Sequence, residues 1–330
     1  MVRGIYAMTK NSSLKIAKTI LICGATGFIG RNLVNYWAGK PNVEVIAVWH
    51  VRQPFETPPC VRWVQCDLRK PDEVDALVKG CDIIIQAAAA TSGSKDIIDK
   101  PHIHVTDNAV MNSYLLRAAY DNSINNFIFF SCSVMYPSSK HPVKETDFTG
   151  EIMPEYTGAG WTKVYIEKMC AFYASIGNTR HTVIRHSNIY GPYDKYDLEK
   201  SHVFGATITK AMLADKKVTI WGAGEEKRDL LHVQDLLNFI DLAIENQKNA
   251  FGLYNCGSGK SISVGDLAQK IITATGKDLS LEYDVSKPNI PFNLSLDSTK
   301  AGIELGWKAK ITLEDGISDA IRWWQGNVKG

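Results

Sequence analysis

The sequence predicts an α/β fold, in which a doubly wound parallel sheet with helices on both faces is joined to a smaller, closely packed α/β domain. Three observations predict this arrangement. Short, continuously apolar strand patterns alternate with helix patterns between residues 19 and 185, a glycine-rich turn follows the first strand directly, and the alternation loosens after residue 186. Continuous apolar strands separated by helices are typical of a parallel sheet that is buried on both faces.

The expected elements follow one another in a regular order. The first apolar strand, 19–23, runs into the glycine turn, and an amphipathic helix pattern follows over 28–37. Residues 71–79 are expected to form a short helix because Pro71 and Asp72 suit a first helical turn. The remaining patterns predict strands at 43–48, 82–86, 126–130 and 182–185, and helices at 105–120, 161–175, 203–214 and 233–245.

Composition and charge argue against several classes of protein. The chain has 37 Lys and Arg against 35 Asp and Glu, so its net charge of +2 gives no electrostatic case for binding nucleic acid or an anionic membrane. No apolar run approaches the roughly 18 residues that a membrane span needs. The seven cysteines are odd in number and scattered, which fits reduced thiols in a cytoplasmic protein better than a disulfide framework.

The strongest local signal is the segment Gly24-Ala25-Thr26-Gly27-Phe28-Ile29-Gly30. Between a strand and a helix, such glycines allow a tight turn and a close approach of the backbone to a pyrophosphate, which then lies at the helix N-terminus. The segment therefore predicts dinucleotide binding, with contacts from Gly24, Thr26, Gly27, Phe28, Ile29 and Gly30.

The end of the second strand bears on which dinucleotide binds. Proteins that bind NAD usually carry an acidic residue there, which holds the ribose 2′-hydroxyl. This chain reads Val48-Trp49-His50-Val51-Arg52 instead, and Arg52 is suited to a 2′-phosphate. NADP is therefore the favoured cofactor, with NAD as the alternative and a solvated loop charge as the simpler reading of Arg52.

Several further segments resemble, in the expected order, those of one enzyme family. They are Cys66-Asp67-Leu68, Gln86-Ala87-Ala88-Ala89, Ser131-Cys132-Ser133-Val134-Met135-Tyr136-Pro137, Arg185-His186-Ser187-Asn188-Ile189-Tyr190-Gly191-Pro192, Trp221-Gly222 through Lys227-Arg228-Asp229-Leu230-Leu231-His232-Val233, and Leu305-Gly306-Trp307 followed by Thr312-Leu313-Glu314-Asp315-Gly316-Ile317. With the glycine turn, these segments resemble the extended short-chain dehydrogenase/reductase superfamily, in its epimerase/dehydratase branch that acts on nucleotide sugars. The resemblance extends from residue 17 to residue 325.

The resemblance implies an organisation of the chain. A lead-in, 1–16, precedes a Rossmann-type dinucleotide-binding domain over 17–185, and a nucleotide-sugar domain over 186–330 interleaves with it. It also implies a homodimer that pairs the helices at 105–120 and 161–175.

The resemblance further implies roles for individual residues. Cofactor contacts are expected from Asp67 and Leu68 at the adenine, from Ala87, Ala88 and Ala89 along the cofactor, from Lys163 at the nicotinamide ribose, and from His186. Contacts to the sugar nucleotide are expected from Ser131, Asn188, His202 and Arg228, with Arg228 on the diphosphate.

Two positions depart from the family pattern. The family's Tyr-x-x-x-Lys motif exchanges a proton through its tyrosine, but the residue four positions before Lys163 is Ala159. Tyr156 is the nearest substitute, and packing at the helix start is the alternative reading of that residue. The family's catalytic Ser/Thr position holds Cys132, a weak hydrogen-bond donor, so that either Cys132 or the neighbouring Ser133 is expected to position the sugar oxygen.

Within the family, Tyr136-Pro137 and Ser201-His202-Val203 resemble the GDP-L-fucose synthase-like enzymes. The histidine of those enzymes falls on His202, while Val134 stands where they carry an epimerising cysteine, which puts double epimerisation in doubt. His102 and His104 suit a surface loop better than a metal site, no metal is expected, and Gly257-Ser258-Gly259-Lys260 suits a plain turn.

Three functions remain open. The first is a 4-ketoreductase or 4-dehydrogenase of a nucleotide sugar, with a GDP-sugar favoured. The second is an epimerase that retains its cofactor. The third is a catalytically lapsed relative that binds cofactor or nucleotide sugar, which the alanine at position 159 favours.

Overall fold

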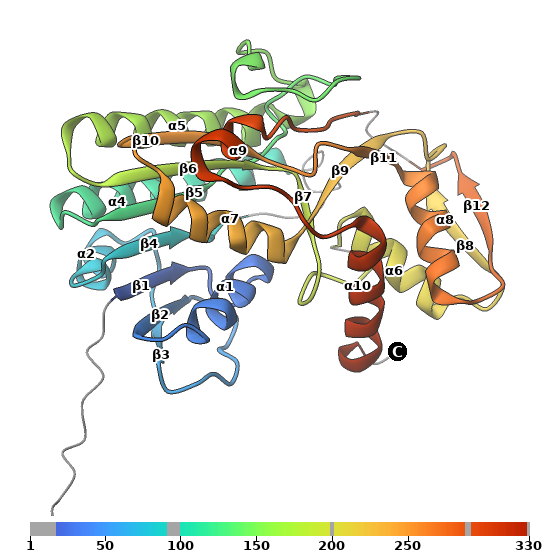
Figure 1. The fold of residues 1–330 in the computed structure, drawn as a ribbon, viewed down its shortest axis with the longest axis horizontal. Coiled ribbons are helices and arrows are strands. Elements are labelled where there is room, and N and C mark those ends of the chain that lie inside the picture. Colours follow the sequence, from blue (N-terminus) through green and yellow to red (C-terminus); the bar gives the residue numbers. More distant parts are fainter. Residues whose placement is uncertain (1–17, 91–99, 199–200, 288–291, 329–330) are drawn as a thin grey trace, which may run out of the picture.

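The computed structural model describes residues 18–90, 100–198, 201–287 and 292–328. A seven-stranded sheet, parallel throughout, forms its centre in the order β10-β6-β5-β4-β1-β2-β3 (Figure 1). Its strands are β1 (Lys18–Cys23), β2 (Val43–Trp49), β3 (Val61–Gln65), β4 (Ile83–Gln86), β5 (Asn126–Phe130), β6 (Arg180–His186) and β10 (Phe251–Cys256).

Helices cover both faces of this sheet. One face packs against α1 (Phe28–Ala38), α7 (Val233–Asn246) and α9 (Thr299–Leu305), and the other against α2 (Pro71–Val78), α4 (Thr106–Asp121) and α5 (Thr157–Ile176). Alternate residues of each strand enter the two cores: Ile20 and Ile22 face the first, Leu21 and Cys23 the second. The strands are continuously apolar because both of their faces are buried.

A smaller part lies at one end of the sheet (Figure 1). Its strands pair in the orders β11-β9-β7 and β12-β8. The elements are β7 (Asn188–Tyr190), β8 (Lys217–Trp221), β9 (Lys227–His232), β11 (Ser261–Ser263), β12 (Ser280–Asp284), α6 (Val203–Leu213), α8 (Val264–Thr275) and α10 (Leu313–Asn327). Short 3-10 turns stand at η1 (Pro101–His104), η2 (Glu145–Asp147) and η3 (Pro154–Tyr156).

The predicted fold class, a doubly wound parallel sheet, is confirmed. Every expected strand is present. In the main sheet, β3 and β10 were not expected. Only Val61 of the five residues of β3 is buried, so this edge strand has no continuous apolar run, and β10 lies where the alternation of the sequence loosens. The expected helix at 161–175 begins one turn earlier, at Thr157. Beyond residue 186, β10 is a strand of the main sheet and α7 packs against one of its faces. The chain therefore passes between the two parts more than once. The domain boundary at residue 186 stays a prediction.

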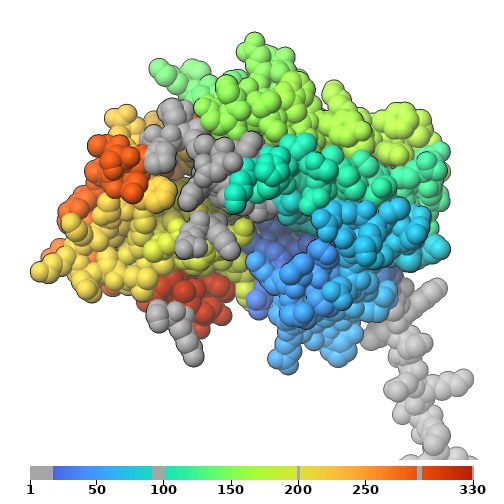
Figure 2. Space-filling model, turned by 180° about the vertical axis from the view of Figure 1, so that it is seen from behind, coloured from blue at the N-terminus to red at the C-terminus, as the bar shows by residue number. Residues whose placement is uncertain are grey.

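The strand order reverses at β1, whose neighbours are β2 on one side and β4 on the other. In doubly wound sheets, ligands bind in the crevice that opens at the carboxyl ends of the strands at such a switch point. Figure 2 shows one face of the molecule, on which the blue-to-green residues of the first half of the chain lie beside the yellow residues of the smaller part.

Candidate active site

One cavity of about 980 Å³ runs along the carboxyl ends of the central strands and reaches β7 and α6 of the smaller part. It brings together nearly all of the residues that the sequence predicts for the site. Those that line it are Gly24, Thr26, Gly27, Phe28, Ile29, Gly30, Arg52, Asp67, Leu68, Ala87, Ala88, Ala89, Ser131, Cys132, Ser133, Tyr156, Lys163, His186, Asn188 and His202. Arg228 is the exception, since it does not line this cavity.

The glycine turn at one end of the cavity is shaped by close backbone contacts. Gly24 has a φ of +71°, and a Cβ on it would lie 2.7 Å from the backbone of Ala88 at the end of β4. A Cβ on Gly30 would collide with the carbonyl oxygen of Gly24. Gly27 begins α1 without a side-chain cap, and the first turn holds no acidic residue. Within the turn, the N–H groups of Ala25 and Gly27 already donate to the carbonyls of Val48 and Gly24. The N–H groups that remain for an anion such as a pyrophosphate are therefore those of the first turn of α1.

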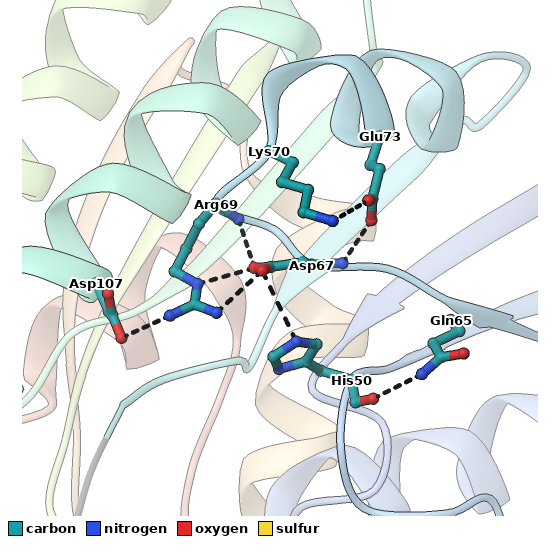
Figure 3. A network of polar contacts seen from close by, with 7 residues as sticks. All are labelled: His50, Gln65, Asp67, Arg69, Lys70, Glu73 and Asp107. Carbon is teal, nitrogen blue, oxygen red and sulfur yellow. Dashed lines mark hydrogen bonds and ion pairs between the residues drawn. The ribbon is translucent and has the colours of Figure 1, made fainter.

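Charged side chains line the rim beside this turn (Figure 3). The Asp67 carboxylate accepts hydrogen bonds from Arg69 Nε and Nη2, both at 2.9 Å, and these bonds lower its pKa to about 2. Arg69 Nη1 also donates to Asp107 at 3.2 Å, so that two carboxylates neutralise this guanidinium. His50 Nε2 lies 3.8 Å from Asp67. The sequence did not reveal that Asp107 holds Arg69, because that contact depends on where α4 lies.

Arg52 lies over the glycine turn. Its Nη1 donates to the Thr26 carbonyl at 3.1 Å, and the side chain is exposed. Because β2 ends without a carboxylate, Arg52 and His50 are the polar groups that follow this strand at the rim.

The other end of the cavity lies where β5 ends beside α5. Lys163 Nζ donates to the Phe130 carbonyl at 2.7 Å and lies 4.7 Å from the centre of the Phe129 ring. Burial lowers the pKa of Lys163, and the nearby Cys132 and Glu167 act against that shift. The ammonium group is therefore fixed beneath the loop that begins at Ser131.

Ala159 lines the cavity one turn before Lys163, so no hydroxyl stands at that position. Tyr156 lines the same cavity from η3, with its ring packed edge-on against Phe292 at 5.9 Å between centres. Burial raises the pKa of Tyr156, whereas the charge of Arg228 acts to lower it. The tyrosine is thus close to Arg228, the residue predicted to hold a diphosphate.

Cys132 and Ser133 occupy the start of the loop after β5. Burial raises the pKa of the Cys132 thiol, and the Lys163 ammonium opposes this effect. All seven cysteines lie within the described residues and are free thiols, which gives Cys132 no covalent partner.

The histidines of the cavity differ in their surroundings. The ring Nδ1 of His186 lies 2.7 Å from the Ser187 carbonyl, and burial lowers its pKa to about 4. His202 directly precedes α6, and its side chain is accessible to solvent. Partial desolvation by the surrounding cavity walls and the charge of Lys195 lower its pKa. The imidazole rings of His186 and His202 are therefore both neutral at neutral pH. Asn188, on β7, donates to the Asp229 carbonyl at 3.1 Å.

Arg228 extends from β9 toward the segment at Phe292. Its Nη1 donates to the carbonyls of Phe292 and, at 3.1 Å, of Lys227. A diphosphate would have to compete with these carbonyls for the guanidinium.

Asp194, which is not among the site residues that the sequence predicts, also lines the cavity. Its Oδ1 accepts the Lys195 N–H at 2.7 Å, while its buried Oδ2 has no hydrogen-bond partner within the described residues. Burial raises the pKa of Asp194 to about 7. The preceding Tyr193 has a φ of +68°, unusual for an aromatic residue. In the sequence, the Gly191-Pro192 turn marks this region, but it does not indicate that Asp194 is buried.

The structure differs from the expectation for His104 and agrees with the one for residues 257–260. His104 is buried in η1 rather than placed in a surface loop, because the turn folds it against α4. Gly257–Lys260 is a turn, as expected, and Asp229 accepts from the N–H groups of Ser258 and Gly259. Within the described ranges, no group of three potential metal ligands is found, and no helix has the length and apolarity to cross a membrane.

Comparisons with known proteins agree with this geometry. The model of the NAD dependent epimerase/dehydratase family matches residues 20–257. The chain is 28% identical to GDP-L-colitose synthase of Yersinia pseudotuberculosis, covering 92% of this chain and 97% of that one. It is also 28% identical to GDP-L-fucose synthase of Escherichia coli (strain K12), covering 74% of this chain and 81% of the relative.

Among solved structures, UDP-glucose 4-epimerase of Thermotoga maritima, seen with UDP-glucose, superposes with a TM-score of 0.83. That match covers 94% of this chain and 100% of the other at 23% identity, so it supports the fold alone. The family model spans more than half of the chain, and the glycine turn, Lys163 and the loop after β5 lie in one cavity. The chain belongs to the NAD dependent epimerase/dehydratase family.

Proposed function

We propose that this protein is a nicotinamide-dependent oxidoreductase that acts at C4 of a nucleotide-linked sugar, as a 4-ketoreductase or 4-dehydrogenase. The observation that carries the proposal is the single cavity, which joins an anion-binding glycine turn at one end to Lys163, Cys132 and His202 at the other. A GDP-sugar is the favoured substrate, because the relatives with 28% identity are named for GDP-L-colitose and GDP-L-fucose.

The residues present fit a dinucleotide. Gly24 and Gly30 allow the tight turn, because a Cβ on either would collide with the neighbouring backbone, and the first turn of α1 that follows it carries no acidic residue. In the proposal, Arg52 meets a ribose 2′-phosphate, Asp67 and Leu68 contact the adenine, and Lys163 holds the nicotinamide ribose. NADP is the favoured cofactor and NAD the alternative. When bound, the nicotinamide supplies or accepts the hydride.

The sugar oxygen needs a partner for its proton. Ser133 or Cys132 positions that oxygen, with Ser131 and Asn188 nearby in the same cavity. Because Ala159 has no hydroxyl, the proton passes through Tyr156, His202 or an ordered water. General acid–base assistance contributes about 10²–10⁴-fold to a rate, so a site that lacked all of these would be slow rather than inactive.

Two other functions have support. An epimerase with a retained cofactor is favoured by the name of one structural neighbour at 25% identity, UDP-glucuronic acid 4-epimerase of Bacillus cereus, seen with UDP-glucuronic acid and NAD. A catalytically lapsed protein that binds cofactor or nucleotide sugar is favoured by Ala159. The first yields no net change in nicotinamide redox state, and the second yields no turnover.

A homodimer is part of the proposal. Trp161, Tyr165, Phe172 and Ile176 form one apolar stripe on α5, and each is 47–57% exposed. Their spacing places them on the same face of the helix. Apolar stripes of this kind mark protein interfaces, and α5 packs beside α4. A cytoplasmic location is consistent with the free thiols.

The first experiment identifies the nicotinamide that the purified protein carries. The protein is denatured, and any released nucleotide is identified by mass together with its redox state. Retained NAD or NADH would favour an epimerase over the exchanging NADPH enzyme. No retained cofactor, with tighter binding of NADPH than of NADH, would support the reductase.

A further inference from the structure

A buried ion pair lies beneath the cavity without lining it. Glu167 on α5 and Arg185 at the end of β6 are 4% and 3% exposed. Arg185 Nε donates to Glu167 Oε1 at 3.0 Å, and Nη2 donates to Oε2 at 2.7 Å. Burying two charges is costly, so an ion pair of this kind is weak evidence for stability alone. Its other contacts indicate what it does.

Glu167 holds the beginning of the loop after β5. Ser131 Oγ donates to Glu167 Oε1 at 2.6 Å. One helical turn earlier, Lys163 donates to the carbonyl of Phe130, the residue before Ser131. Two consecutive residues at the end of β5 are therefore fixed by two residues on the same face of α5.

Arg185 holds the other end of the same loop. Its Nη1 donates to the Tyr136 hydroxyl at 2.8 Å, and that hydroxyl donates to Asn255 Oδ1 at 2.8 Å. Cys132 and Ser133 lie between the two anchored residues, Ser131 and Tyr136. One ion pair thus fixes both ends of the loop that carries these side chains.

We propose that Glu167 is a positioning residue of this site, which with Arg185 as counterion fixes both ends of loop 131–136 and sets the electrostatic environment of Lys163. The proposal rests on the proposed function only in assigning the nicotinamide ribose to Lys163. Glu167 itself touches neither the cofactor site nor the cavity.

The charges around Lys163 support the electrostatic part. Burial lowers the pKa of Lys163, and Cys132 and Glu167 raise it in return. From the end of β6, His186 also lies close enough for Lys163 to affect its pKa. Removing the Glu167 charge takes away one of the two effects that raise the pKa of Lys163 against burial. The ammonium is therefore expected to lose its proton at a lower pH.

The test measures NADPH affinity by fluorescence titration between about pH 7 and 10, the range in which a lysine of lowered pKa titrates. In Glu167→Gln, the pH at which affinity falls is expected to move down by at least about half a pH unit. The matched control is Asp121→Asn, which breaks the exposed Arg117–Asp121 pair on α4 and leaves the midpoint in place. Repeating the comparison in Cys132→Ser removes the titration of the thiol.

A second readout follows the loop directly. Ser131→Ala removes the hydrogen bond but keeps both charges, so the loop is expected to loosen while the midpoint stays unchanged. Alkylation of Cys132 by iodoacetamide should then become several-fold faster, with the partly exposed Cys60 as the internal reference.

The contradicting results are distinct. An unshifted midpoint in Glu167→Gln, together with an unchanged alkylation rate in Ser131→Ala, would overturn the positioning role and leave the ion pair a structural element only. Should Glu167→Gln fail to fold, Glu167→Gln/Arg185→Gln removes both anchors of the loop without leaving an unpaired buried charge. Its readout is the alkylation of Cys132, which is expected to become several-fold faster, and an unchanged rate would overturn the positioning role. A wild-type protein that binds neither NADPH nor NADH would overturn the proposed function instead.

Discussion

At the scale of single residues, the site is defined by what replaces a missing hydroxyl. Ala159 offers only a methyl group one turn before Lys163, while Tyr156, Cys132 and His202 reach the same cavity from η3, the loop after β5 and the start of α6. Burial raises the pKa of the tyrosine and of the thiol. Both groups are therefore protonated at neutral pH and able to donate.

The first prediction concerns Tyr156. If its hydroxyl transfers the proton, Tyr156→Phe should lower kcat at least about tenfold, since general acid–base assistance is worth about 10²–10⁴-fold. The measurement is steady-state oxidation of NADPH with a nucleotide-linked 4-keto sugar. Ala159→Tyr in the Tyr156→Phe background restores the family's tyrosine position and should recover part of the rate. A kcat unchanged in Tyr156→Phe would assign the proton to His202 or to water.

The second prediction concerns Asp194. Its pKa of about 7 lies above the value of about 4 that it has in an unfolded chain, so the folded state binds more protons between those limits. The protonated carboxyl therefore contributes its full share of the folding stability below about pH 4. This contribution decreases as the pH rises and is lost above about pH 7. Asp194→Asn mimics the neutral acid and should be more stable than the wild type at pH 8, with the difference vanishing toward pH 4. Urea denaturation at both pH values checks this, and equal stabilities at pH 8 would contradict it.

At the scale of elements, the sequence predicts what periodicity and local turns determine. The strands β1, β2, β4, β5 and β6 are buried on both faces and read as apolar runs, and the glycine turn reveals the start of α1. The strand β3 escaped prediction because the exposed Arg62 and Gln65 interrupt its apolar residues, of which Trp63 and Val64 are only half-buried. The motif residues of the site were predictable because each lies in a contiguous segment. The burial of Asp194, the Arg69–Asp107 contact and the pairing of Arg185 with Glu167 were not predictable, since they arise from tertiary packing.

The third prediction concerns the apolar stripe on α5. Tyr165 is 55% exposed near its middle, so a carboxylate there should oppose burial of the stripe. Tyr165→Asp is expected to turn a dimer into a monomer in sedimentation velocity without lowering the melting temperature of the monomer. Tyr283→Asp, a similarly exposed tyrosine on β12, is the matched control and should leave the dimer intact. A wild-type protein that sediments as a monomer would contradict the assignment of this face.

At the scale of the whole molecule, the segment after β7 is fastened to α1 beside the glycine turn. The Arg31 guanidinium on α1 lies between the rings of Phe55 and Tyr193, at 4.2 and 4.3 Å from their centres. On the same helix, Asn32 donates to the Pro192 carbonyl at 2.9 Å. The turn that carries Asp194 is therefore held against the helix that begins at the glycine turn, which couples the two halves of the cavity.

The fourth prediction concerns acid stability. His181 is 1% exposed, both of its ring nitrogens lack a partner within the described residues, and burial lowers its pKa to about 4. The unfolded chain therefore binds more protons between about pH 6.5 and 4, and stability should fall by about 1.4 kcal/mol per pH unit for this one group as the pH drops through that window. The buried His186 adds to the same slope.

Urea unfolding followed by tryptophan fluorescence tests this prediction across the window. His181→Leu should show a shallower loss of stability than the wild type, while His141→Leu changes an exposed histidine and serves as the control. A slope equal to that of the wild type in His181→Leu would contradict the assignment to this residue.

The central claim is hydride transfer between a nicotinamide and C4 of a nucleotide-linked sugar. The most direct measurement uses NADPH deuterated at its transferable position together with a panel of GDP-, UDP-, CDP- and dTDP-linked 4-keto sugars, and locates the label by NMR. The account predicts one deuterium at C4 of the product, one NADPH consumed per sugar, and the highest rate with a GDP-sugar. With the corresponding 4-hydroxy sugars in place of the ketones, inversion at C4 with no deuterium incorporated and no net change in NADPH would instead show an epimerase. The absence of any product across the panel, from a protein that still binds NADPH, would contradict the claim altogether.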